Sequence, residues 1–81
     1  MRIRVKLFAI LRDQAGQSEA SLELPEGATV QLARQRLIQT LPAIAPYMDR
    51  VAFAINLSYA RPESVLHDGD ELAVLPPVSG G

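Results

Sequence analysis

The stretch Arg2–Phe8 reads RIRVKLF, and apolar and basic residues alternate along it until the final Phe8. Successive side chains of a β-strand point to opposite faces, so a period of two over seven residues predicts a strand. Ile3, Val5 and Leu7 would face the core, and Phe8 would share the outer face with the basic residues. We therefore expect a sheet to form around this strand.

Three further segments have the pattern of strands. Turn residues occupy Arg12–Ser18, and the alternating ASLEL at Ala20–Leu24 can return as the second arm of a hairpin. VAFAIN at Val51–Asn56 and ELAVL at Glu71–Leu75 predict the other two strands. The last strand follows an Asp68-Gly69 pair, which is typical of a tight turn.

One helix is predicted in VQLARQRLIQTL, at Val30–Leu41. Thr29 can cap it, because its hydroxyl can accept a backbone N–H of the first turn. Pro42 and Pro46 end the helix and make the following stretch irregular. Apolar residues spaced three and four apart form its buried stripe: Val30, Ala33, Leu37 and Leu41.

Together these elements predict an α+β domain in which one mixed sheet has one main helix packed on one face. The 81 residues suffice for one small core, which we expect to comprise residues 1–75. Residues 76–81 would form an extended C-terminal tail. Because a single helix covers one face only, the other face of the sheet must meet solvent or a partner.

This uncovered face is predicted to carry a small apolar patch. If the first and last strands are neighbours, Phe8 and Leu75 lie near each other at the end where the tail leaves. Arg12 and Tyr59 are candidates for the rim of the patch, since Arg and Tyr are enriched in protein interfaces. Single exposed apolar residues are also ordinary on proteins, so a face that binds nothing is the alternative.

Composition argues against several classes of function. Without cysteine, the chain has no disulfide, no thiolate metal site and no cysteine nucleophile. A formal net charge of −1 gives no general attraction to nucleic acid or to anionic membranes. No apolar stretch is long enough for a signal peptide or a membrane span, so we expect a cytoplasmic protein.

Potential metal ligands cluster at His67, Asp68, Asp70 and Glu71. The cluster has one histidine and no sulfur, and Asp-Gly-Asp is a turn signature, so a solvated turn is favoured over a metal site. No serine is paired with a histidine and a carboxylate in a recognisable context, and no glycines form a phosphate loop. We expect no metal and no catalysis by the chain alone.

The C-terminal residues PPVSGG combine stiffness with slimness. Pro76 and Pro77 hold the exit extended, because proline fixes φ and favours polyproline II. Gly80 and Gly81 have no side chains and can pass through a slot too narrow for a β-carbon. Six residues reach at most about 20 Å, enough to enter a partner's pocket. A frayed terminus or a cloning scar would also carry Gly-Gly.

The ending DGDELAVLPPVSGG resembles the C-terminus of the small subunits of molybdopterin synthase, a family of ubiquitin-like sulfur carriers with a β-grasp fold. LFAILRD at Leu7–Asp13 and AINLSYA at Ala54–Ala60 resemble the corresponding segments of this family, and the similarity covers essentially the whole chain. Thiamine-pathway sulfur carriers share the fold and the terminal glycines, but they are usually shorter and lack the double proline.

The resemblance implies that other proteins catalyse the reactions of this chain's C-terminal carboxylate. An adenylyltransferase similar to ubiquitin E1 would use ATP to adenylate the carboxylate of Gly81, and a sulfur donor protein would then convert it to a thiocarboxylate. The tail would enter the active site of the large synthase subunit and give its sulfur to cyclic pyranopterin monophosphate. This chain would bind no cofactor itself.

Residue by residue, the resemblance matches Gly81 to the thiocarboxylated glycine and Gly80 to its slim neighbour. Leu75 stands where an aromatic can occur and Tyr59 where an aliphatic can occur, and both keep the patch apolar. Other functions stay open: a protein modifier joined to lysines through Gly81, a sulfur carrier for another pathway such as that of thiamine, and an interaction module whose tail is inert. The residues that the resemblance assigns to partner binding are Phe8, Arg12, Tyr59, Leu75, Pro76, Pro77, Val78 and Ser79.

Overall fold

The structure is a computed structural model that describes residues 1–77. The expectations for Val78, Ser79, Gly80 and Gly81 therefore lie outside the described residues. The elements in chain order are β1 (Arg2–Leu7), α1 (Ala9–Ala15), β2 (Glu19–Glu23), α2 (Val30–Thr40), the 3-10 helix η1 (Pro42–Arg50), β3 (Ala52–Ile55), β4 (Ser58–Ala60) and β5 (Glu71–Leu75).

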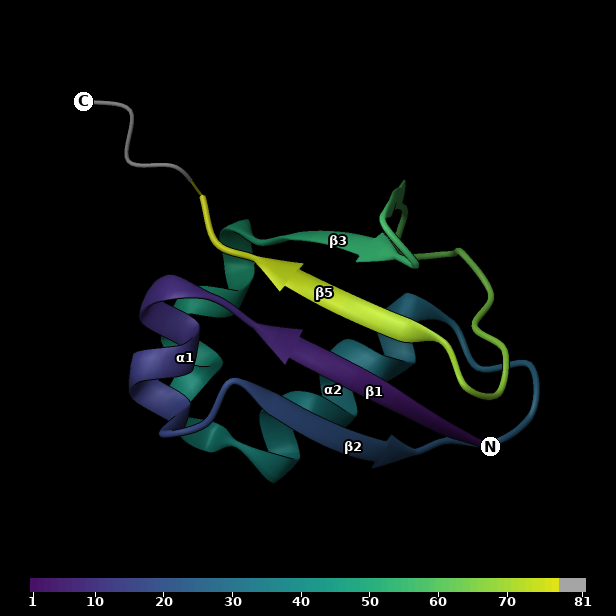
Figure 1. The fold of residues 1–81 in the computed structure, drawn as a ribbon, viewed down its shortest axis with the longest axis horizontal. Coiled ribbons are helices and arrows are strands. Elements are labelled where there is room, and N and C mark those ends of the chain that lie inside the picture. Colours follow the sequence, from purple (N-terminus) through teal and green to yellow (C-terminus); the bar gives the residue numbers. More distant parts are fainter. Residues whose placement is uncertain (78–81) are drawn as a thin grey trace.

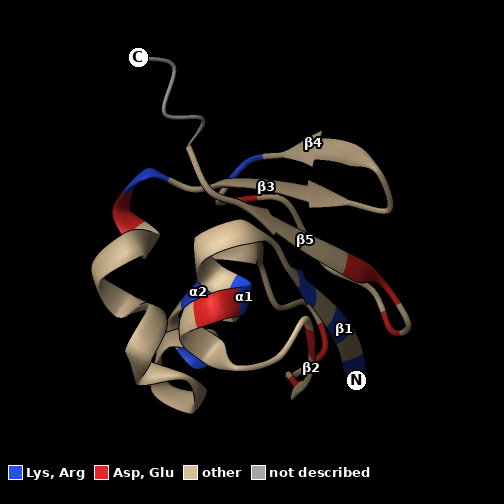
Figure 2. Ribbon diagram, turned by 60° about the vertical axis from the view of Figure 1, so that its left-hand side comes forward, with Lys and Arg blue, Asp and Glu red and all other residues tan. Residues whose placement is uncertain are grey.

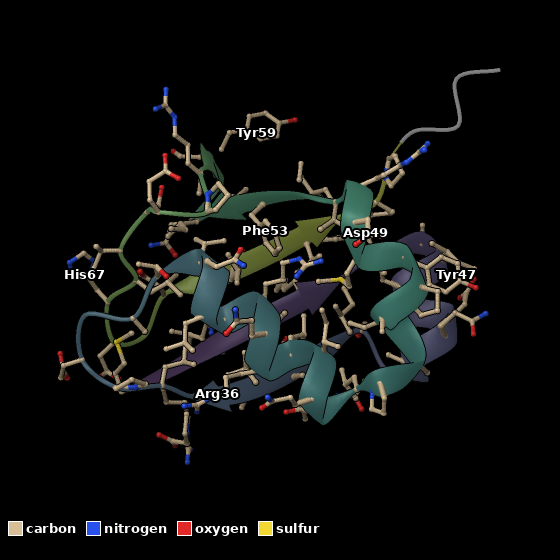
Figure 3. The ribbon with its side chains drawn as sticks, turned by 180° about the vertical axis from the view of Figure 1, so that it is seen from behind. Arg36, Tyr47, Asp49, Phe53, Tyr59 and His67 are labelled. Carbon is tan, nitrogen blue, oxygen red and sulfur yellow. The ribbon has the colours of Figure 1, made fainter. Side chains whose placement is uncertain are left out.

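All five strands of this region belong to one mixed sheet in the order β2-β1-β5-β3-β4. The central pair, β1 and β5, is parallel, and the other three pairs are antiparallel (Figure 1). Viewed from behind, α2 and η1 cross in front of the sheet, so they cover the same face (Figure 3). This arrangement confirms the predicted α+β fold and is the one expected of a β-grasp domain.

The core lies between the sheet and the helices. The predicted alternation of β1 is confirmed, because Ile3, Val5 and Leu7 are at most 2% exposed. Five buried apolar residues of α2 and β5 belong to the same cluster: Val30, Ala33, Leu37, Leu72 and Val74. Burial of these side chains is the main favourable term that holds α2 on the sheet.

The start of α2 follows its predicted cap. Thr29 Oγ1 accepts a hydrogen bond from the backbone N–H of Leu32 at 3.4 Å. After the helix, the stretch expected to be irregular forms η1, which buries Ile44 and Met48. Arg34 of α2 fastens the two segments together, since its Nη2 donates to the carbonyl oxygen of Met48 at 3.3 Å.

The turn predicted at Arg12–Ser18 is wrong in its first half, because these residues end α1, a second helix that the sequence did not indicate. With seven residues and Leu11 as its one buried side chain, α1 is too short to show a helical period. It ends at Gly16, whose backbone is left-handed (φ 73°) and whose N–H donates to the carbonyl oxygen of Arg12.

A fifth strand, β4, was also not predicted, since its three residues are too few to reveal alternation. It pairs with β3 across a two-residue loop at Asn56 and Leu57, which have φ of 48° and 73°. Positive φ at both positions is the type I′ pattern of hairpins. Among the helices within residues 1–77, none has both the length and the apolar character that crossing a bilayer requires.

Candidate functional site

The register of the strands determines which side chains share the uncovered face. Cross-strand partners point to the same side of a sheet, so the pairings define rows. One row crosses all five strands and consists of Glu19, Lys6, Ala73, Ala54 and Tyr59. Ala73 and Ala54 belong to this row of the uncovered face, and they are 9% and 7% exposed.

The next row toward the tail contains the predicted apolar patch. Leu7 pairs with Val74 in the parallel ladder, and Phe8 and Leu75 directly follow them. Phe8 keeps an extended backbone (φ −128°, ψ 154°), so it continues the line of β1 beside Leu75. The Phe8 side chain is 41% exposed and Leu75 is half-buried. The structure thus brings these two residues together where Pro76 begins the exit from the sheet.

The two rim candidates occupy different elements. Tyr59 lies on the edge strand β4, 84% exposed, and in Figure 3 it projects away from the body of the domain. It is two strands away from β5, a distance of about 10 Å across the sheet. Arg12 is not on the sheet: it is exposed on α1, where its Nε lies 3.7 Å from Oδ1 of Asp13.

The face changes character from one strand to another. Figure 2 shows basic residues on β1 and acidic residues on β2 and at the start of β5. Lys6 Nζ lies 3.4 Å from Glu71 Oε1, and Arg2 Nε lies 2.7 Å from Glu23 Oε1. Exposed pairs of this kind contribute little to stability. The charged half of the face is therefore partly neutralised, and the apolar half lies toward β3, β4 and the tail.

A hollow of about 270 Å³ opens at the base of the tail. Sequence reasoning missed it, because it forms only where three distant segments meet. Its walls come from α1, from η1 and from the residues after β5: Ile10, Pro46, Tyr47, Asp49, Arg50, Pro76 and Pro77.

The predicted turn is formed by the cluster of potential metal ligands at His67, Asp68, Asp70 and Glu71. Asp68 Oδ1 accepts the backbone N–H of Arg2 at 2.8 Å, and Gly69 has φ 85°. Asp70 accepts two hydrogen bonds, from the N–H of His67 at 2.8 Å and from the side-chain amide of Asn56 at 2.9 Å. These carboxylates hold the turn and the β3–β4 hairpin. Within residues 1–77 no group of three potential ligands could hold a metal ion.

Comparisons with known proteins agree along the whole length. The ThiS family model matches residues 5–81. The "Molybdopterin synthase sulfur carrier subunit" of Chlamydomonas reinhardtii is 41% identical over 83 residues, with all of both chains covered. SAMP1 of Haloferax volcanii, a small archaeal modifier protein, has a TM-score of 0.91 and 31% identity over all of both chains. The putative molybdopterin converting factor, subunit 1, of Pyrococcus furiosus has a TM-score of 0.83 and 32% identity over 96% of this chain and 99% of that one.

Proposed function

This chain belongs to the ThiS family, and from that membership we propose that it is the small, sulfur-carrying subunit of a molybdopterin synthase. The observation that carries the proposal is the 41% identity, over all of both chains, to a relative of that name. In this function the chain works in molybdenum cofactor biosynthesis and supplies sulfur rather than catalytic side chains.

The chemistry takes place on the terminal carboxylate of Gly81. An E1-like adenylyltransferase binds ATP, the carboxylate attacks the α-phosphorus, and pyrophosphate leaves. A sulfur donor protein then delivers sulfur at the oxidation level of sulfide to the acyl carbon, and AMP leaves as the thiocarboxylate forms. In the large subunit, that sulfur passes to cyclic pyranopterin monophosphate and the carboxylate is restored. The chain itself holds no cofactor, and both catalysts belong to partners.

The position of the tail suits this role. It follows β5, which is paired on both sides by β1 and β3, so the point of departure is fixed. Pro76 and Pro77 come directly after the strand, and their restricted φ aims the chain away from the sheet. Gly80 and Gly81 are narrow enough to enter a closed active site. The domain can therefore stay outside while its last atoms react inside a partner.

The open face then serves as the docking surface for both the large subunit and the activating enzyme. Phe8 and Leu75 lie next to the tail and contact a partner first, with Tyr59 farther along the same face. Arg12 contributes from α1. Pro76, Pro77, Val78 and Ser79 are the tail residues that line the partner's channel.

Intact-mass spectrometry tests this proposal. The protein is incubated with ATP, the activating enzyme of the same organism and a sulfur source. We expect a mass change that corresponds to replacement of one oxygen by sulfur, and no change when Gly81 is deleted. The proposal would be contradicted if the mass stayed unchanged although the same preparation of activating enzyme loaded sulfur onto another carrier protein.

A second candidate, a protein modifier, is favoured by the similarity to SAMP1, the small archaeal modifier protein. In that function the activated carboxylate of Gly81 forms an isopeptide bond with lysines of other proteins. A ladder on a denaturing gel that persists in reducing agent and requires Gly81 would support it. A thiocarboxylate without such a ladder leaves the sulfur carrier as the sole function.

A further inference from the structure

The function proposed above assigns no role to Ile10, Tyr47 or Arg50, which help to line the hollow at the base of the tail. Its apolar wall combines Ile10, which is 37% exposed, with the ring of Tyr47 and the two prolines that begin the tail. Asp49 and Arg50 add charge to the lining. Concave, mostly apolar surfaces with a few polar groups are the usual form of binding sites.

The walls of the hollow are held in place from behind. Ile44 and Met48 of η1 are buried in the core, so the segment that carries Tyr47 is anchored on both sides of that residue. Arg34 reaches from α2 to the Met48 carbonyl and to the Asp49 carboxylate, 3.4 Å away. Figure 3 shows Tyr47 and Asp49 projecting from this segment. A preformed hollow costs a partner less ordering entropy on binding.

The length of the tail limits how far a partner's active site can lie from the hollow. Four residues follow Pro77, and even a fully extended chain of four spans at most about 14 Å. An active site that holds Gly81 must therefore lie within that distance of the hollow's wall. A protein that encloses a catalytic centre extends well beyond 14 Å on the scale of a domain, about 30 Å across. Its surface must therefore come close to Pro76 and Pro77, which form part of the hollow's wall.

The two charges of the lining differ in their availability. Asp49 already has Arg34 as an ion-pair partner at 3.4 Å. Arg50 makes no salt bridge with any other residue of the described range 1–77. A guanidinium in this position can form two parallel hydrogen bonds with a carboxylate. The hollow thus fits an apolar side chain that has an acidic neighbour.

We propose that this hollow is a docking pocket for the large subunit of molybdopterin synthase. One aliphatic or aromatic side chain of that subunit enters between Ile10, Tyr47 and the prolines, and an acidic residue beside it pairs with Arg50. The proposal rests on the proposed function. We assign the pocket to the large subunit rather than to the activating enzyme, because sulfur transfer requires the tail to stay in place and a filled pocket slows dissociation.

Calorimetric titration against the large subunit of the same organism tests the pocket. Ile10→Asp buries a charge in the contact and should weaken binding at least about tenfold. Arg50→Glu turns the proposed attraction into repulsion and should weaken it by about tenfold. The matched controls are Val65→Asp, 49% exposed near the start of α2, and Arg36→Glu, which Figure 3 shows far from Asp49. Both controls should bind within about twofold of the wild type.

The possible outcomes distinguish a failure of the pocket proposal from a failure of the proposed function. If Ile10→Asp and Arg50→Glu bind as tightly as the controls, the pocket proposal is overturned and the sulfur carrier stands. If they keep large-subunit binding but lose sulfur loading by the activating enzyme, the assignment to the large subunit is overturned. A wild type that neither binds nor loads sulfur refutes the proposed function itself. Arg50 is exposed, so Arg50→Glu decides the matter should Ile10→Asp fail to fold.

Discussion

At Leu57 the backbone conformation and the residue type disagree. Its φ is 73°, a left-handed value that costs a side-chain-bearing residue about 1–2 kcal/mol, and its side chain is 89% exposed. Glycine removes this strain in a type I′ turn. We therefore predict that Leu57→Gly raises the free energy of unfolding by about 1 kcal/mol, measured by urea denaturation.

The neighbouring Ser58 gives the control for that experiment. It lies in β4, where glycine has no strain to relieve and only adds freedom to the unfolded chain. Ser58→Gly should lower the free energy of unfolding by about 0.5–1 kcal/mol. A loss of stability in both variants would mean that the strain at Leu57 is absent.

A substitution at Phe8 should weaken partner binding without affecting the fold. Its side chain is 41% exposed beside Leu75 and is not part of the buried core. We predict that Phe8→Glu leaves the far-ultraviolet circular dichroism spectrum unchanged. Binding to the large subunit should weaken by at least about tenfold, because a charge replaces an apolar contact. Global unfolding of the variant would place Phe8 in the core instead.

At the scale of elements, the sequence was informative where patterns are long. The alternation of β1 and the stripe of α2 predicted both elements to within one residue. The sequence did not predict α1 or β4. These elements have seven and three residues, and the tertiary contacts that hold such short segments produce no periodic pattern in the sequence. The adjacent positions of Phe8 and Leu75 were predictable because they depend only on the pairing of the first and last strands. The hollow was not, because it requires three segments to be packed first.

The turn before β5 links two elements through one carboxylate. Asp70 accepts hydrogen bonds from His67 in the turn and from Asn56 in the β3–β4 hairpin, and its side chain is 13% exposed. We predict that Asp70→Ala lowers the free energy of unfolding by about 2 kcal/mol, since both donors lose a charged acceptor. Chemical denaturation measures this directly.

Asp13 is the matched control for Asp70. Its carboxylate makes an exposed ion pair with Arg12 at 3.7 Å, so Asp13→Ala should change stability by less than about 0.5 kcal/mol. If the two alanine variants are equally stable, the turn does not fasten the hairpin to β5.

At the scale of the whole molecule, the topology gathers at one end the residues to which we assign the proposed function. Because β1 and β5 are parallel, Phe8 and Leu75 finish together, and α1 starts at the same end of the sheet (Figure 1). The segment η1 returns there before β3, whose first residue pairs with Leu75. The Asp68-Gly69 turn and the hairpin loop occupy the opposite end. The turn and loop that hold the strands together therefore lie at the end of the sheet opposite to the one from which the tail leaves.

This separation leads to a prediction about Gly81. Within the described residues, the core ends with β5, so a change five or more residues later should leave the thermal unfolding midpoint unaltered. Gly81→Ala keeps the length and the carboxylate but adds a β-carbon at the reacting end. A misplacement of about 1 Å in an active site can reduce the rate by about a hundredfold, and we predict a loss of that order in thiocarboxylate formation. The rate is followed by intact mass, with the Gly81 deletion as the reference for complete loss. Loading of Gly81→Ala at the wild-type rate would mean that the activating enzyme does not require a slim terminus.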